Sequence, residues 1–233
     1  GYFPPTIELL EEFGLLEDVA ACSFRSCDLM LHFPLIGERI ILSLAALEGT
    51  AKYPYFLSVG QHVLGQIIVG YLDRLPNAQV LWNHRVEALA QDAKGVTLTV
   101  ATSDGPRELH ADWLIGADGA RSTVRTLLGL PFEGFTWPDR FVATNLRFDF
   151  EKHGFSPHNM VHHPVDWAVI ARTGPDDIWR VTFGEDPNLP EQEIRRRIPA
   201  HYAKILPGDE PYEVVAAAPY RVHERTCPTY RVG

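Results

Sequence analysis

The sequence has 233 residues, of which 45% are hydrophobic, 22% are charged and 11% are aromatic. This composition is typical of a globular protein and excludes a disordered or fibrous chain. The formal net charge of -9 argues against nucleic acid as a general partner, because neutralising phosphates requires a basic surface. The longest apolar runs are too short to cross a bilayer, and the three cysteines form no CxxC pair. We therefore expect a cytoplasmic protein without a membrane span.

The first half of the chain alternates between helical and strand patterns. Apolar residues at helical spacing predict helices over residues 6–18 and 61–74. Short apolar or β-branched runs predict strands at residues 40–42, 79–82 and 113–116. A meander with turn residues between its strands is expected over residues 85–90, 95–101 and 107–110.

The second half has the pattern of a half-buried sheet. Polarity alternates along residues 144–150, as it should on a strand with one buried face. Residues 173–177 have the composition of a turn between two further strands. A helix with a break or kink at Pro199 is expected over residues 191–206. The remaining strands are expected at residues 167–172, 178–184 and 212–221.

The segment at residues 114–125, LIGADGARSTVR, is the most informative. It combines a short apolar strand, an acid between two glycines and a helix that starts at Ser122. Ligands bind open α/β sheets at the carboxyl ends of strands, where Asp118 could accept hydrogen bonds from sugar hydroxyls. Ser122 could cap the helix, whose amino terminus favours phosphate oxygens. The alternative is a left-handed turn with a capping acid and no ligand.

GADGARSTVR resembles the conserved Asp-Gly segment of FAD-dependent aromatic-ring hydroxylases, the flavoprotein monooxygenases of the para-hydroxybenzoate and phenol hydroxylase type. The resemblance implies that Asp118 lies near the flavin diphosphate and ribose, with Gly119 and Arg121 beside it. It also implies that Gln61 faces the flavin and that the backbone at Val86 approaches the adenine.

The same resemblance implies a partial FAD-binding domain of the glutathione-reductase-like Rossmann type, over residues 1–30 and 60–130. An antiparallel or mixed substrate-binding sheet would occupy residues 31–59 and 131–225, so the expected class is α/β plus α+β. By analogy with the family, the substrate cavity would be lined by Tyr55, Asn145, Arg147 and Trp167.

Two family motifs do not occur in the sequence. There is no GxGxxG, and there is no Gly-Asp motif of the kind that contacts the flavin near the end of the family's cofactor domain. The resemblance therefore covers an interior portion of the family's architecture. We expect this chain by itself to hold FAD weakly or not at all.

The resemblance implies a monooxygenase that takes hydride from NAD(P)H onto FAD and hydroxylates a phenolic small molecule with molecular oxygen through a flavin hydroperoxide. The sequence indicates no catalytic side chain, and its histidines have no metal-ligand spacing. Two alternatives remain open. One is another flavin oxidoreductase of the same superfamily, such as an epoxidase, halogenase or prenyl reductase. The other is a non-enzymatic binding module that has lost FAD.

Overall fold

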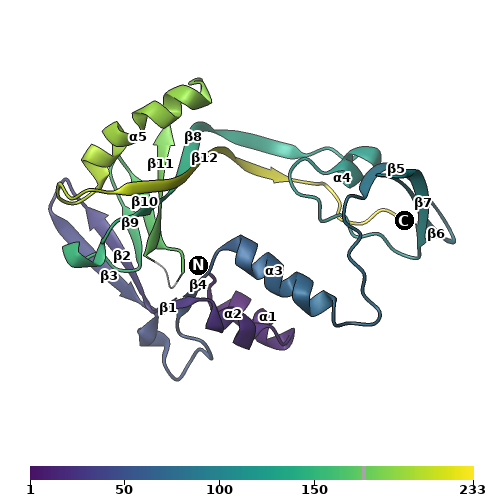
Figure 1. Cartoon of the computed structure of the whole chain (residues 1–233), viewed down its shortest axis with the longest axis horizontal. Helices are drawn as coiled ribbons and strands as arrows, with labels where there is room; N and C mark the ends of the chain where they lie inside the picture. The colour runs from purple at the N-terminus through teal and green to yellow at the C-terminus, as the bar shows by residue number, and fades with distance from the viewer. Residues whose placement is uncertain (175–176) are drawn as a thin grey trace. The chain divides into compact units, whose positions relative to one another are not determined.

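The structure is a computed structural model that describes residues 1–174 and 177–233. The chain forms two compact units (Figure 1). The first unit comprises residues 1–75 and 138–222, and the second comprises residues 76–137 and 223–233. Each unit is described by itself below.

The first unit is built on a seven-stranded sheet. Its strands are β2 (Asp28–Phe33), β3 (Glu38–Ser43), β8 (Glu133–Arg147), β9 (His158–Val161), β10 (Ala168–Arg172), β11 (Ile178–Glu185) and β12 (Glu213–Thr226). Residues 133–137 of β8 and residues 223–226 of β12 belong to the second unit. Their order across the sheet is β12-β8-β11-β10-β9-β2-β3. The sheet is mixed, because β2 pairs with β9 in parallel while β8, β11, β10 and β9 pair antiparallel with one another in turn. The strands predicted in the second half of the chain and at residues 40–42 are thereby confirmed.

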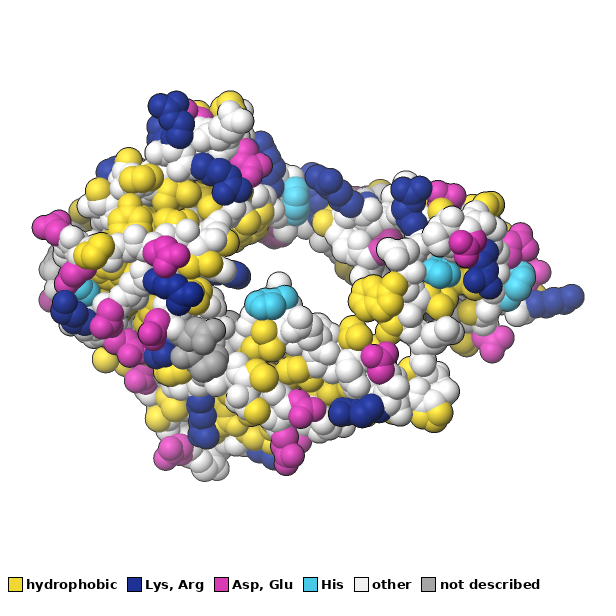
Figure 2. Space-filling model, in the orientation of Figure 1, with side chains coloured by type: hydrophobic (Ala, Val, Ile, Leu, Met, Phe, Trp, Pro, Cys, Tyr) yellow, Lys and Arg dark blue, Asp and Glu magenta, His cyan; other side chains and the backbone are white. Residues whose placement is uncertain are grey.

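Helix α5 (Glu191–Ile205) covers one face of this sheet (Figure 1). Its buried side chains recur every three or four residues and pack against alternate residues of β8, β10 and β11. This spacing is what an amphipathic helix needs to bury one stripe. The predicted helix is confirmed, and it continues through Pro199. Figure 2 shows further hydrophobic side chains gathered beside α5.

A second hydrophobic cluster of the first unit joins three helices from the N-terminal part of the chain. They are α1 (Pro4–Glu12), α2 (Leu16–Ala21) and α3 (Gln61–Leu72), which accompany the short strands β1 (Phe24–Ser26) and β4 (Phe56–Ser58). The predicted helix over residues 61–74 is confirmed. The helix predicted over residues 6–18 is present as two helices, because Gly14, which the sequence marks as a helix stop, takes a φ of 69° and separates α1 from α2. Two short 3-10 helices, η1 (Leu44–Leu47) and η2 (Glu151–His153), complete the unit.

The second unit contains the predicted meander. Its strands are β5 (Arg85–Asp92), β6 (Gly95–Thr102) and β7 (Gly105–Ala111), paired antiparallel in that order, and α4 (Thr123–Leu127) follows. In the β5–β6 turn, the Asp92 carboxylate accepts a 2.7 Å hydrogen bond from the Lys94 N–H, and Gly95 has a φ of 140°. Both features are typical of turns.

The strands predicted at residues 79–82 and 113–116 are wrong, because neither segment is a strand. A strand requires a hydrogen-bonded neighbour, and the described part of the chain places none beside either segment. Their apolar side chains are correspondingly exposed, at 66% for Trp82, 74% for Trp113 and 88% for Ile115. An apolar run therefore did not suffice to predict a paired strand.

Together, the mixed sheet, the meander and the helices confirm the predicted combination of α/β and α+β structure. The two units are defined by compactness, whereas the resemblance predicts a division by function into an FAD-binding domain and a substrate-binding sheet. The predicted domain boundaries therefore stay a prediction. The turn predicted at residues 173–177 includes residues 175–176, which lie outside the described residues. No helix in the part of the chain that the structure describes is long and apolar enough to span a membrane.

Candidate functional site

The segment around Asp118 forms a hydrogen-bonded turn in the second unit. Gly119 has a φ of 78°, a conformation that favours glycine and that turns the chain back toward α4. The Asp118 Oδ2 atom accepts hydrogen bonds from the N–H groups of Thr123 at 2.7 Å and Val124 at 3.1 Å. The Ser122 hydroxyl donates to Asp118 Oδ1 and accepts a 2.9 Å hydrogen bond from the Arg125 N–H. The predicted cap of α4 by Ser122 is confirmed.

These hydrogen bonds keep Asp118 ionised. Burial raises the pKa of this carboxyl, but the hydrogen bonds from Ser122 and from the N–H groups of Val124 and Thr123 outweigh that effect and hold the pKa below its ordinary value. A carboxylate is a strong hydrogen-bond acceptor. The Asp118 side chain is exposed, so a ligand can approach it.

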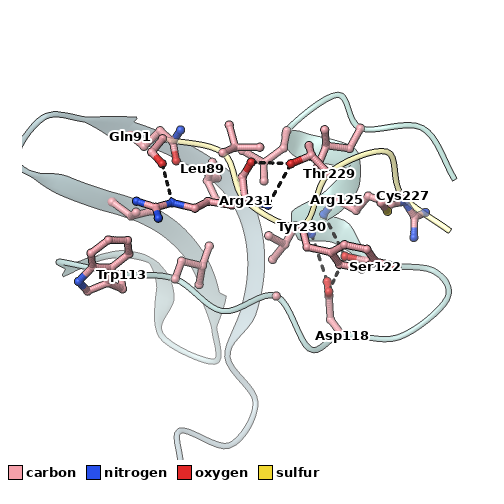
Figure 3. A pocket seen from close by; sticks show the side chains of 18 of the residues that line it. Leu89, Gln91, Trp113, Asp118, Ser122, Arg125, Cys227, Thr229, Tyr230 and Arg231 are labelled. Atoms are coloured by element: carbon pink, nitrogen blue, oxygen red, sulfur yellow. Dashed lines mark hydrogen bonds between the residues drawn. The ribbon is translucent and has the colours of Figure 1, made fainter.

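A hollow of about 1120 Å³ adjoins this turn within the second unit (Figure 3). Close packing brings the preceding segment onto α4, since a Cβ on Gly116 would lie only 3.0 Å from Val124 Cγ1. The hollow has the mixture of apolar and polar lining that is usual in small-molecule sites. Its lining includes Trp113, Asp118, Gly119, Ser122, Arg125 and Tyr230.

The geometry of this turn shows which parts of an FAD molecule its residues could bind. An exposed, ionised carboxylate at Asp118 fits a sugar hydroxyl, as the sequence predicts. The expected use of the α4 amino terminus for phosphate does not fit, because the N–H groups of Thr123 and Val124 already donate to Asp118. The turn would therefore contact FAD through the carboxylate rather than through the backbone donors of α4.

Of the predicted cofactor contacts, the structure brings Asp118 and Gly119 together at the hollow. Arg121 is an exposed neighbour in the same turn, and Val86 is half-buried in β5; neither lines the hollow. Gln61 is the first residue of α3, in the first unit, and is exposed. The roles of these residues toward FAD stay predictions.

Three of the four predicted substrate residues share one face of the large sheet. Successive residues of a strand point to opposite faces. Val142, Thr144 and Leu146 are buried on the α5 side, so Asn145 and Arg147 point to the other side.

Trp167 lies on this second face as well. It packs against Phe141 at 4.8 Å between ring centroids, and a Cβ on Gly184 would lie 3.0 Å from its ring. Tyr55 lies elsewhere in the first unit, where the Arg25 guanidinium is 3.7 Å from the centre of its ring. Sequence reasoning missed Arg180, which donates from Nε to Asn145 Oδ1 at 3.1 Å on the same face.

Comparisons with known proteins identify the family. Residues 2–233 match the model of the FAD binding domain family. The chain is 42% identical over 237 residues to para-nitrophenol 4-monooxygenase of Pseudomonas sp. strain WBC-3. It is 40% identical over 233 residues to 6-hydroxy-3-succinoylpyridine 3-monooxygenase HspB of Pseudomonas putida. All of this chain is covered in both cases, and it spans 59% of the length of each relative.

A further relative and a solved structure agree with this result. The chain is 32% identical over 214 residues to a 3-(3-hydroxy-phenyl)propionate/3-hydroxycinnamic acid hydroxylase of Mycolicibacterium smegmatis, with 88% of the chain and 36% of the relative covered. The crystal structure of p-nitrophenol 4-monooxygenase PnpA from Pseudomonas putida DLL-E4 superimposes with a TM-score of 0.96 at 42% identity, covering 100% of this chain and 60% of that one. This chain therefore belongs to the FAD binding domain family.

Proposed function

We propose that this chain is part of an FAD- and NAD(P)H-dependent monooxygenase of the cytoplasm that hydroxylates a phenolic small molecule with molecular oxygen. The observation that carries the proposal is the 42% identity to para-nitrophenol 4-monooxygenase along the whole chain. The names of all three relatives describe an aromatic ring that bears a hydroxyl group. A hydroxylated aromatic ring is therefore the substrate class that we propose.

The residues of this chain would bind and orient the reactants. Bound FAD would supply the redox chemistry, accepting hydride from NAD(P)H and passing one oxygen atom from O₂ to the ring. Asp118, oriented by Ser122, would accept a hydrogen bond from a hydroxyl of the cofactor's sugar portion. Gln61, Val86 and Arg121 are the further cofactor contacts that we propose.

The test compares flavin binding and turnover in the intact enzyme and in its Asp118→Ala variant. In the unchanged enzyme, 4-nitrophenol should stimulate both NAD(P)H oxidation and formation of a hydroxylated product. Losing one hydrogen bond to a charged group costs about 1.5–3 kcal/mol, so Asp118→Ala should weaken FAD binding by about tenfold to a hundredfold. Flavin absorbance and fluorescence during a titration with FAD measure this change.

Two matched variants separate cofactor contact from helix capping. Ser122→Ala removes the cap hydroxyl but keeps the Asp118 carboxylate, so its effect on FAD affinity should be smaller. Asp104→Ala removes an exposed carboxylate in the β6–β7 turn and should change nothing. Bound flavin without hydroxylated product would favour another flavin oxidoreductase, and absence of flavin from the intact protein would favour the binding module.

A further inference from the structure

The face of the large sheet opposite α5 carries a row of residues that are neighbours on adjacent strands. On β11, Trp179, Val181 and Phe183 are buried against the α5 side, so Arg180 points the other way. Arg180 is paired in register with Asn145 on β8 and with Ala171 on β10. Neighbouring strands lie about 5 Å apart, so these three side chains stand next to one another.

Arg180 brings a positive charge to this row. No carboxylate among residues 1–174 and 177–233 forms an ion pair with it. Arg147, on the same face, differs because its Nε lies 3.4 Å from a Glu213 carboxylate oxygen. The hydrogen bond from Arg180 Nε to Asn145 fixes one edge of the guanidinium and leaves its other N–H groups for a ligand.

The field of Arg180 reaches neighbouring groups. Burial raises the pKa of the Tyr220 phenol, and the positive charge of Arg180 acts on that pKa in the opposite direction. A positive charge favours the ionised form of a nearby phenol by this same effect. For Tyr220 burial outweighs this effect and the pKa stays above its ordinary value, but the charge of Arg180 would act in the same direction on a phenolic ligand placed beside it and favour the phenolate.

The surroundings of Arg180 suit a flat aromatic ring. Its neighbour Ala171 has only a methyl group, and in the next row Thr182 pairs in register with Ala143 and Val169. A hollow of about 490 Å³ lined by Met160, Trp167 and Val169, among others, begins beside this second row and provides apolar contacts.

We propose that Arg180, oriented by Asn145, holds the oxygen of a phenolic substrate as its phenolate on this face of the sheet. The O–H bond of the phenol breaks, its electron pair stays on oxygen, and the proton passes to solvent. A phenolate is more electron-rich than a phenol and reacts faster with an electrophilic oxygen donor. Arg180 is thus a residue that selects and activates the substrate, and Asn145 is its positioning residue. This inference rests on the proposed function, whose substrate class it narrows.

The experiment measures binding of 4-nitrophenol to the oxidised, FAD-loaded intact enzyme without NAD(P)H. The visible absorbance band of 4-nitrophenolate reports how much of the bound ligand is ionised at each pH. Arg180→Gln should raise the Kd by about tenfold to a hundredfold, the range expected for a lost hydrogen bond to a charged group. It should also lower the ionised fraction of the bound ligand. Arg180→Lys should restore part of that fraction because it restores the charge.

Two variants of Asn145 test its positioning role. Asn145→Asp places a carboxylate beside Arg180 and should abolish the preference for phenolate while the guanidinium remains. Asn145→Ala should raise the Kd severalfold with little change in the ionised fraction. The matched control is Arg196→Gln on α5, whose side chain is exposed and pairs with Glu193 at 3.1 Å. It should leave both measurements unchanged.

A neutral ligand distinguishes charge recognition from loss of the fold. Arg180→Gln should bind 4-nitroanisole, which has no ionisable proton, within about twofold of the unchanged enzyme. Equal losses for both ligands, or an unchanged ionised fraction in Arg180→Gln, would overturn the proposal. The assay needs no turnover, so Arg180-dependent phenolate binding without hydroxylation would contradict the proposed function and leave this inference standing. Hydroxylation that is unchanged in the Arg180 variants would support the proposed function and contradict this inference.

Discussion

The two units of the chain reach order by different means. The first unit contains both hydrophobic clusters, and α5 alone contributes four buried side chains to the larger one. In the second unit, among the residues that the structure describes, Val100 is the one fully buried hydrophobic side chain. The start of α4 in this unit is held by polar contacts, in the turn formed by Asp118 and Ser122.

This difference bears on the two candidate sites. The face that carries Arg180 belongs to a sheet whose other face is packed, so its geometry rests on burial of apolar surface. The turn at Asp118 depends on a few local hydrogen bonds, each of which contributes about 1–3 kcal/mol. We therefore expect changes in the core to affect the sheet strongly, and changes of single polar groups to affect the second unit locally.

The largest expected effect on stability comes from an isoleucine-to-alanine substitution in the core of the first unit. The same substitution in the second unit serves as the comparison. Ile170 is fully buried in β10, whereas Ile115 is 88% exposed in the second unit. Ile170→Ala should lower the free energy of unfolding by about 2–5 kcal/mol, because it leaves a cavity in a packed core. Ile115→Ala should change it by about 0.5 kcal/mol or less. Urea denaturation of both variants measures the difference, and equal effects would mean that the contrast between the units is false.

The strands of the first unit could be predicted because their sequence carries the burial pattern. Residues 144–150 and 178–184 alternate in polarity, and the structure buries the alternate positions against α5. Residues 113–116 are apolar throughout, which predicted a buried strand and was wrong. The hydrophobic pattern of a segment indicates that the segment can be buried. It does not indicate which other element would pack against it.

The two candidate sites differ in the same way. Asp118 could be predicted because its turn is local, with an acid, a glycine and a cap within five residues. Arg180 could not, because a charged residue in an alternating strand predicts only an exposed position. Its role depends on its register with Asn145, which lies 35 residues away on another strand. Register across a sheet is set by the packed fold and is not readable from one sequence.

A smaller effect should follow from removing the cap of α4. Ser122→Ala should destabilise the start of α4 by about 1 kcal/mol, the usual cost of losing a serine cap. Amide hydrogen exchange at Thr123, Val124 and Arg125 should accelerate while the strands of the first unit keep their protection. Ser103→Ala is the control, because Ser103 is exposed and bonds only to its neighbour Asp104. Faster exchange in β10 or β11 of the Ser122 variant would show that the two units are not independent.

The smallest expected effect at neutral pH concerns His158. Protonation of this side chain changes the free energy of unfolding only in acid. The ring accepts or donates a 2.8 Å hydrogen bond with the Ser58 hydroxyl and packs against Phe56 at 4.9 Å. Burial lowers the pKa of His158 from 6.5 to about 4. The unfolded chain therefore binds a proton near pH 6.5 that the folded chain binds only near pH 4.

From this sign, the free energy of unfolding should decrease as the pH falls from about 6.5 to about 4, and should be insensitive to His158 above that range. His158→Gln keeps a polar partner for Ser58 without a titrating group, so it should flatten this part of the stability profile. His110→Gln is the matched control, because His110 also contacts a hydroxyl, that of Thr97 at 3.0 Å, but is exposed in the second unit. An equal flattening by His110→Gln would show that the acid sensitivity does not depend on burial of the histidine, and the two units would then not differ in this respect.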